Sequence, residues 1–264
     1  LLLAVFFVGG FSHNGTLYAQ NAPLIDLEAP EWIRNSLSVA TQQAEKMYEK
    51  VERTSLLPRS IAKGLVNAED WTAGFFPGTL WYLYAYNGNN VWKQRAETAT
   101  EMLQKQQFNA ADHDIGFKMY CSFGNGYRLT QDERYKEILL QSARTLSTRF
   151  KPKAGIIRSW DHNKDKWQCP VIIDNMMNLE LLFWATKESK DSTYYNIAVS
   201  HARTTMKNHF RADYSCYHVI DYDTITGQVL KKNTHQGLAH ESAWARGQAW
   251  ALYGYTMCYR ETKL

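Results

Sequence analysis

Charged, histidine and tryptophan side chains recur in this sequence directly before, or at the start of, segments that are rich in apolar and small residues. The set consists of Asp70, Trp71, His113, Asp114, Asp174, Glu241, Trp244 and Arg246. Each of them alone has a structural explanation as a helix cap or a core side chain. Polar residues that converge from separate segments are typical of a functional site. In one pocket, the carboxylates of Asp114 and Asp174 would suit general acid and base catalysis on a sugar.

Asp174 has the most specific surroundings of these residues. It follows the apolar residues 171–173 and precedes Met176 and Met177. Burial among apolar side chains raises the pKa of a carboxyl group and would keep a proton available near neutral pH. A position in the first turn of a helix lowers that pKa. The two effects oppose each other, so the protonation state of Asp174 depends on the tertiary structure.

Tryptophan is abundant, with 9 residues in the chain. Trp71, Trp160, Trp244 and Trp250 offer flat faces against which sugar rings pack. Trp250 follows Trp244 by six positions, which places the two on different faces of a helix. Trp250 therefore has a second interpretation, as a core residue.

Metal and cofactor chemistry has no support in the sequence. The motifs HExxH, GxxxxGK[ST] and GxSxG are absent. Residues 221–226 begin like a calcium loop, but Thr226 stands where that loop needs glycine. No CxxC pair exists, which argues against zinc and predicts buried free thiols at Cys121, Cys169, Cys216 and Cys258. The net charge of +4 is spread too evenly for a nucleic-acid-binding protein.

Two types of helical segment alternate along the chain. Charged amphipathic segments, each with one wet face, are 30–53, 91–108, 132–150 and 192–210. Segments that are apolar on most sides, and therefore buried on most sides, are 74–87, 116–129, 172–187 and 242–259. A single stretch, 217–232, is predicted to be β, as a hairpin around Thr226 and Gly227.

Repeated helical hairpins with one buried and one wet helix form either an open solenoid or a closed toroid. An open solenoid leaves its concave face to water. The nearly all-round apolar inner segments therefore favour closure. The predicted fold class is all-α, an α/α toroid.

The first residues have the pattern of an export signal. Residues 1–11 are apolar and uncharged, and about 20 would be needed to span a bilayer. Ala19 offers a cleavage site, so residues 1–19 are predicted to be the remnant of a signal peptide. A buried N-terminal strand or helix is the alternative. We expect the mature chain, residues 20–264, to be exported to a bacterial periplasm without a membrane anchor.

Four motifs in order resemble the unsaturated glucuronyl hydrolases, glycoside hydrolase family 88. They are DWTAGFFPG at 70–78, HDIGF at 113–117, IDNMMN at 173–178 and SAWARGQAW at 242–250. The resemblance runs from about residue 30 to the end. It implies an (α/α)6 barrel, without a cofactor. It also implies hydration of the C4=C5 double bond in the unsaturated uronic acid that polysaccharide lyases leave on glycosaminoglycan fragments.

Residue roles follow from the same resemblance. Asp174 would protonate C4 and then activate water at C5, and Asp114 would hold ring hydroxyls and support Asp174. Trp71, Trp160 and Trp244 would line the sugar ring, with Trp250 as a further substrate contact. Hydrogen bonds to the substrate and to water would come from His113, His218, Gln236 and Arg246.

Length is the departure from the family pattern. The chain reaches Leu264 after about eight of the twelve helices that the barrel implies, so residues 20–264 are expected to form a catalytic domain that lacks its C-terminal part. Three alternatives stay open: an unsaturated rhamnogalacturonyl hydrolase acting on pectin fragments, an inverting glycosidase that uses Asp114 and Asp174, and a non-catalytic glycan-binding barrel. The sequence leaves the oligomeric state and the preferred sulfation pattern open.

Overall fold

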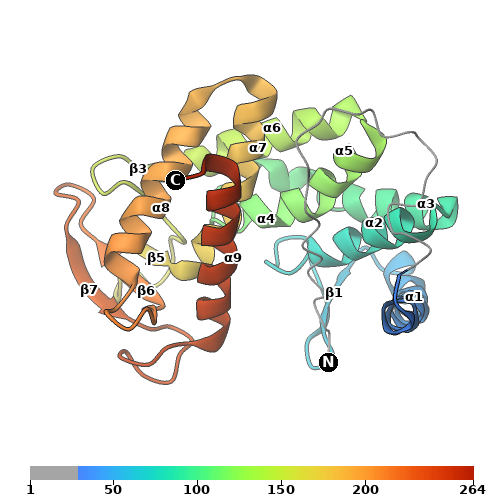
Figure 1. Cartoon of the computed structure of the whole chain (residues 1–264), viewed down its shortest axis with the longest axis horizontal. Coiled ribbons are helices and arrows are strands. Elements are labelled where there is room, and N and C mark those ends of the chain that lie inside the picture. Colours follow the sequence, from blue (N-terminus) through green and yellow to red (C-terminus); the bar gives the residue numbers. More distant parts are fainter. Residues whose placement is uncertain (1–28) are drawn as a thin grey trace.

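A computed structural model describes residues 29–264, which are mostly helical with three small sheets (Figure 1). The predicted signal remnant, residues 1–19, lies outside the described residues. No helix in the described part of the chain has the length and apolar character to cross a membrane.

The predicted wet helices are present with nearly the expected boundaries. They are α1 (Glu31–Glu52), α3 (Asn90–Glu101), α6 (Glu133–Ser147) and α8 (Ser192–His209). Asn89, Asp132 and Asp191 cap three of them by accepting hydrogen bonds from backbone N–H groups of the first turn. The segment 91–108 is not one helix, because α3 ends at Glu101 and a 3₁₀ segment, η1 (Gln104–Phe108), follows.

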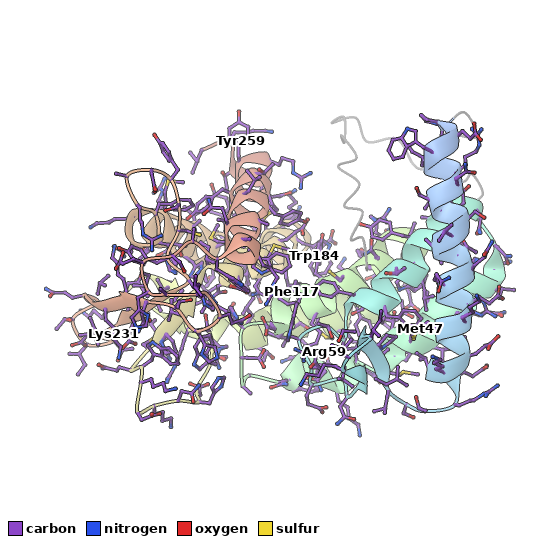
Figure 2. All side chains as sticks on the ribbon, turned by 90° about the horizontal axis from the view of Figure 1, so that it is seen from below. Met47, Arg59, Phe117, Trp184, Lys231 and Tyr259 are labelled. Atoms are coloured by element: carbon purple, nitrogen blue, oxygen red, sulfur yellow. The ribbon has the colours of Figure 1, made fainter. Side chains whose placement is uncertain are left out.

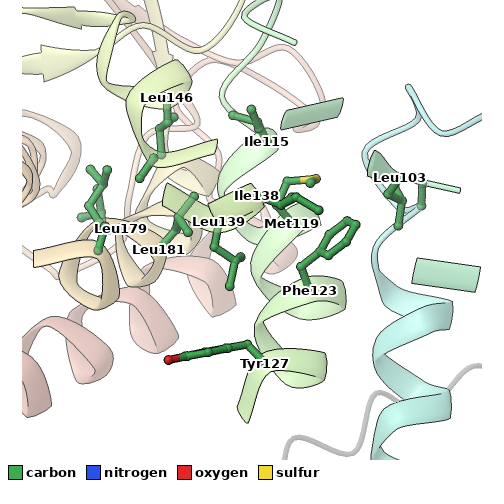
Figure 3. Packing of buried hydrophobic residues seen from close by; sticks show 14 of the residues in the cluster. Leu103, Ile115, Met119, Phe123, Tyr127, Ile138, Leu139, Leu146, Leu179 and Leu181 are labelled. Atoms are coloured by element: carbon green, nitrogen blue, oxygen red, sulfur yellow. The ribbon is translucent and has the colours of Figure 1, made fainter. Parts of the chain in front are cut away.

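The predicted buried helices alternate with them. They are α2 (Phe75–Asn87), α4 (Ile115–Met119) continued by the π-helical η2 (Tyr120–Gly124) and by α5 (Asn125–Thr130), α7 (Leu179–Ser189) preceded by the 3₁₀ segment η3 (Ile173–Asn178), and α9 (Ala245–Thr262). Side chains from α4, η2, α6 and α7 interlock in the main core, where Met119, Phe123, Leu139 and Leu181 are fully or almost fully buried (Figure 3). This core holds the starts of α4 and η3 at a fixed separation.

Two glycines allow the inner elements to approach closely. A Cβ atom added at Gly116 in α4 would lie 2.5 Å from the Cβ of Asn178 in η3. One added at Gly254 in α9 would lie 2.4 Å from the Cβ of Met176. Neither contact is sterically possible for a larger residue without movement of the backbone. Both glycines bring their helices against η3.

The prediction of a single β segment was wrong. The hairpin itself is present as β6 (Val219–Tyr222) and β7 (Val229–Asn233), with Gly227 at a φ of 78° in the turn. However, β5 (Pro170–Ile172) pairs with β6, and two further hairpins are β1 (Leu57–Ser60) with β2 (Gly64–Val66) and β3 (Phe150–Lys151) with β4 (Ile156–Ile157). Strands of two to four residues are too short to show a clear alternation of apolar and polar residues.

All four cysteines are free thiols, as predicted. Cys169, Cys216 and Cys258 are buried, while Cys121 is partly exposed. Within residues 29–264, no group of three or more His, Cys, Asp or Glu side chains is placed to hold a metal ion.

Candidate active site

Asp174 lies in the first turn of η3, directly after β5. The segment is a 3₁₀ helix, not the start of an α-helix as expected from the sequence. The side chain is only 15% exposed. Burial raises the pKa of the Asp174 carboxyl from 3.8 to about 7, against opposing effects of its own backbone N–H, the Arg246 charge and the Trp250 indole. Burial therefore outweighs the helix N-terminus, and Asp174 carries a proton for much of the time at neutral pH.

The three-stranded sheet brings His218 to Asp174. Ile172 in β5 pairs with Val219 in β6, and the Ile173 N–H donates to the His218 carbonyl at 3.1 Å. Because Asp174 and His218 adjoin this pair of strands at the same end, the His218 Nε2 comes to lie 3.6 Å from the Asp174 Oδ1. The sheet thus builds half of the site from residues that are distant in the sequence.

The backbone that follows β7 determines which nitrogen of His218 carries the proton. The N–H groups of His235 and Gln236 both donate to the His218 Nδ1, at 3.1 and 3.2 Å. Burial lowers the pKa of His218 to about 3, so the ring is neutral. A neutral imidazole whose Nδ1 accepts has its proton on Nε2. His218 therefore presents an N–H donor, not a base, toward Asp174.

Asp114 is the second buried carboxyl group. Its backbone N–H donates to the Asp112 carboxylate at 2.9 Å, and its side chain caps no helix although it stands at the start of α4. Its pKa is raised well above the usual range, first by burial and then by the charges of Asp112 and Asp174. The negative charge of Asp174 thus acts on Asp114, as expected for two carboxyl groups in one pocket.

His113 lies beside the carboxyl group of Asp114, just as His218 lies beside that of Asp174. Its Nε2 lies 3.2 Å from the Asp114 Oδ1, and burial lowers its pKa to about 3. The Ser159 Oγ accepts a hydrogen bond from the Ile172 N–H and lies 3.4 Å from the His113 Nδ1, to which its O–H can donate. Each carboxyl group therefore faces a neutral histidine that is oriented by its other nitrogen.

Arg246 brings a positive charge to these carboxyl groups from the start of α9. Its guanidinium lies 4.2 Å from the Trp244 ring centroid and 5.8 Å from that of Trp71. The Arg246 Nη2 also donates to the Gln236 Oε1 at 2.5 Å, and the Trp244 ring lies 4.5 Å from that of His218. These contacts bring together five of the side chains that were predicted to share one site.

Trp71 is held from several directions. It packs edge-on against Phe75 and Phe117, at 5.9 and 6.2 Å between ring centroids. Phe117 lies near the middle of the molecule (Figure 2). Asp70, which precedes Trp71, pairs with Arg59 and accepts hydrogen bonds from the Thr72 N–H and O–H. Asp70 is thus a turn-forming residue, not the cap of α2, whose N-terminal residue is preceded by Gly74.

Lys118 was missed by the sequence analysis. It is 1% exposed inside α4, and its Nζ donates to the carbonyl oxygens of Ala68 and Glu69 at 3.3 and 2.9 Å. These bonds tie the segment that carries Trp71 to the helix that follows Asp114. A single lysine among apolar residues near the start of segment 116–129 was the available signal.

Trp160 does not present an open ring face. It is 6% exposed, stacks on His162 at 5.2 Å and meets Trp167 edge-on at 5.5 Å. Its backbone forms a β-bridge with Asp112, which places it beside the Asp114 segment. Trp167 and His235, which the sequence analysis did not select, complete this aromatic cluster.

Trp250 is a residue of the site and not a buried core residue. It is partly exposed, and its indole N–H lowers the pKa of Asp174. Neither the Trp250 Nε1 nor the Asp174 Oδ1 has a hydrogen bond of good geometry, although both atoms are buried. Buried polar atoms without a formed hydrogen bond are available to a ligand.

The arrangement agrees with the relatives of this sequence. The profile of Glycosyl Hydrolase Family 88 matches residues 40–262. The chain belongs to this family. It is 55% identical over 209 residues to an unsaturated glucuronyl hydrolase of Formosa agariphila, covering 79% of this chain and 52% of that protein. It is 35% identical over 202 residues to an unsaturated chondroitin disaccharide hydrolase of Streptococcus pneumoniae, covering 75% and 51%.

A solved family 88 structure has the same architecture. It is a crystal structure of an unsaturated glucuronyl hydrolase specific for heparin, with a TM-score of 0.85 and 50% sequence identity, covering 89% of this chain and 63% of that one. The family 88 fold is an α/α barrel, so the predicted toroid is confirmed and the open solenoid is excluded. The chain spans about half the length of the curated family 88 relatives that it matches.

Proposed function

We propose that this protein removes the unsaturated uronic acid from the non-reducing end of lyase-generated glycosaminoglycan oligosaccharides by hydration of the C4=C5 double bond. The observation that carries the proposal is the Asp174 carboxyl group, whose pKa is raised to about 7 by burial. Hydration of a vinyl ether needs a group that can first give a proton and then take one, and such a group is most effective when its pKa lies near the working pH.

Asp174 performs both proton transfers in this proposal. The carboxylic acid gives its proton to C4 while the double-bond electrons form the new C4–H bond, which leaves positive charge shared by C5 and the ring oxygen. The Asp174 carboxylate then takes a proton from a water molecule whose oxygen bonds to C5. The product is a hemiketal, which opens and releases the neighbouring sugar.

The neighbours of Asp174 have complementary roles. His218 donates its Nε2–H toward the Asp174 carboxylate or the water between them, because its Nδ1 is occupied by the His235 and Gln236 N–H groups. Arg246 supplies positive charge for the substrate carboxylate, and the neighbouring Trp71 and Trp244 rings provide apolar surface for the sugar. Asp114 holds ring hydroxyls beside its His113 donor.

Similarity to the relatives favours glycosaminoglycan fragments over pectin fragments. The names of the similar proteins include unsaturated glucuronyl, heparin-specific and chondroitin disaccharide hydrolases. The unsaturated rhamnogalacturonyl hydrolase alternative uses the same chemistry on another sugar. An inverting glycosidase would instead attack an intact glycosidic bond, with Asp114 and Asp174 as base and acid.

One experiment separates these alternatives. Unsaturated chondroitin, hyaluronan, heparin and rhamnogalacturonan disaccharides are incubated with the full-length protein, and the ultraviolet absorbance of the double bond is followed. Direct hydration consumes the double bond before the neighbouring sugar is released, glycosidic hydrolysis releases that sugar before the absorbance falls, and mere binding leaves the absorbance unchanged. We expect loss of absorbance with the glycosaminoglycan set, abolished in Asp174→Asn. Turnover of the rhamnogalacturonan substrate alone would reject the proposed substrate class, and unchanged absorbance throughout would reject the proposed reaction.

Export is part of the proposal as well. The apolar run of residues 1–11 supports secretion to the periplasm. Fractionation of the native bacterium, with an antibody against the mature chain, tests this. Recovery of the protein in the cytoplasm at its unprocessed length would overturn the assignment.

A further inference from the structure

A second concave site lies beside the three-stranded sheet, apart from Asp174. It is a cavity of about 380 Å³ between the sheet and the loop that connects β4 to β5. Four basic residues line it: Arg158, Lys164, Lys166 and Lys231. Lys231 lies at the periphery of the molecule (Figure 2). We call this site the lysine cavity.

Positive charge exceeds negative charge in the lysine cavity, whose lining has four basic and two acidic residues. Arg158 pairs with Asp161 at 2.9 Å, but no carboxylate of residues 29–264 lies within ion-pair distance of Lys164, Lys166 or Lys231. Of the two acids, Asp165 is exposed, and the buried Asp221 carboxylate accepts from the Gln168 and Cys169 N–H groups at 3.1 and 2.7 Å. A concave surface with unpaired ammonium groups attracts a compact anion.

The loop that carries two of these lysines has a defined conformation. The N–H groups of Lys166 and Trp167 both donate to the Asn163 carbonyl, at 3.0 and 3.1 Å. The Lys231 Nζ donates to the Lys166 carbonyl, which holds the loop against β7. The Trp167 Nε1 donates to the Asn233 Oδ1 at 3.1 Å. These bonds fix the backbone of the loop and the side chain of Lys231.

The lysine cavity is connected to the catalytic group through the aromatic cluster. Trp167 lines the cavity and meets His235 edge-on at 5.4 Å, while the His235 N–H donates to the His218 Nδ1. Asp221, in the cavity wall, belongs to β6, which begins directly after His218. The aromatic cluster therefore joins the wall of the lysine cavity to the residues that contact His218.

We infer that the lysine cavity binds an anionic substituent, a sulfate ester or a carboxylate, on a sugar unit beyond the unsaturated residue that is processed at Asp174. This inference rests on the proposed function for the identity of the oligosaccharide. The shared chemistry is that of a small oxyanion, which ammonium groups bind by charge-assisted hydrogen bonds. The cavity thus makes the protein selective for charged substrates.

The test compares the full-length wild-type protein with the double variant Lys166→Ala/Lys231→Ala. The substrates are an unsulfated unsaturated chondroitin disaccharide, its sulfated forms, and an unsulfated hyaluronan tetrasaccharide that carries an internal carboxylate. We expect KM to rise about tenfold or more for the substrate whose anion occupies the cavity, with kcat retained. A rise for the sulfated disaccharides assigns a sulfate ester, and a rise for the tetrasaccharide assigns a carboxylate.

Lys232→Ala is the matched control. Lys232 neighbours Lys231 on β7, so its side chain leaves the other face of the sheet, where its Nζ donates to the Asn208 carbonyl. We expect no change in KM for any of these substrates. In the wild-type protein, added salt raises KM for the charged substrate, and this dependence is weaker in the double variant.

Two results would overturn the inference. One is an equal loss of activity on all substrates in the double variant, which would make the lysines structural. The other is unchanged KM for every substrate. If the wild-type protein turns over none of them, the proposed function fails, and the cavity is then tested alone by calorimetric titration of the same sulfated disaccharides and tetrasaccharide. Equal affinity of wild type and double variant in that titration would reject the lysine cavity as an anion site.

Discussion

The proton of Asp174 is the central chemical feature of this site. Its carboxyl has a pKa of about 7 because burial disfavours the charged form. The proposed reaction begins with the protonated acid. We therefore expect kcat/KM to fall as the pH rises above about 7, and Asp174→Asn to lower kcat by about 10²–10⁴-fold while substrate binding is retained. A pH–rate profile that is flat from pH 6 to 9 would contradict the assignment.

The same carboxyl predicts an effect on stability. In the unfolded chain an aspartate loses its proton near pH 4, whereas folded Asp174 keeps it up to about pH 7. The folded state binds more protons in this window, so the stability contributed by Asp174 is present below about pH 4 and lost as the pH rises to about 7. Asp174→Asn removes that loss. We expect the Tm of the variant, relative to wild type, to be higher at pH 8 than at pH 5.

His218 offers a direct spectroscopic prediction. Because two backbone N–H groups donate to its Nδ1, nitrogen NMR of the labelled protein should show the proton on Nε2 and no titration between pH 5 and 8. His218→Gln retains a donor near the Nε2 position, while His218→Asn does not. We expect activity to fall about tenfold more in the asparagine variant. A proton on Nδ1, or a titration near neutral pH, would exclude the donor role.

At the scale of elements, the side chains of the candidate site are positioned mainly by small strands and 3₁₀ segments, and less by the long helices. The β5–β6 pair aligns Asp174 with His218, and η3 sets Asp174 at the start of an inner segment. The long helices supply the core that supports them. Contact between α4 and η3 determines how far Asp114 lies from Asp174.

Gly116→Ala tests the importance of that contact. The added Cβ atom would lie 2.5 Å from the Asn178 Cβ and Oδ1, and the Asn178 Oδ1 accepts from the Phe117 N–H at 2.9 Å. We expect a loss of about 1–3 kcal/mol in the free energy of unfolding, together with a fall in kcat. Denaturant unfolding measures the first effect. The exposed Thr79→Ala serves as a control, and equal stability of the two variants would contradict the close approach.

At the scale of the whole molecule, segments from opposite ends of the described chain meet at the site. Arg246 from α9 lies over Trp71, which precedes α2, and its charge acts on Asp174 in η3. Within α9, Gly254 packs on Met176 and the Tyr253 hydroxyl donates to Glu180 at 3.0 Å. The position of the guanidinium is therefore a property of the folded barrel.

Arg246→Met tests whether the Arg246 charge acts on Asp174 and on the substrate. The Arg246 charge lowers the pKa of Asp174, so its removal raises that pKa and moves the alkaline limb of the pH–rate profile to higher pH. We also expect KM for the anionic substrate to rise about tenfold or more. Methionine preserves the apolar contact with Trp71 and Trp244. An unshifted alkaline limb with normal KM would show that Arg246 does not act on either group.

Much of the architecture was predictable because helix amphipathicity is a local property. Inner and outer helices matched the expected alternation, and most of the residues that precede inner helices meet at one end. Glu241 does not, because its exposed carboxylate accepts from the Tyr217 hydroxyl instead. The β5 strand, Lys118 and the Trp167–His235 contact were not predictable, since each depends on partners many residues away. The burial of Trp160 was missed because its ring is covered by His162 and Trp167 of its own loop and by the distant His235.

The sequence by itself determined most of the residues that reach the site, because the order of apolar and amphipathic segments decides where each inner helix begins. Only the tertiary structure decided what those residues can do. Asp174 illustrates the difference, since its position at a helical N-terminus favours the charged form and its apolar neighbours favour the neutral one. The neutral form prevails because desolvation depends on every element that packs around the carboxyl, and those elements come together only on folding.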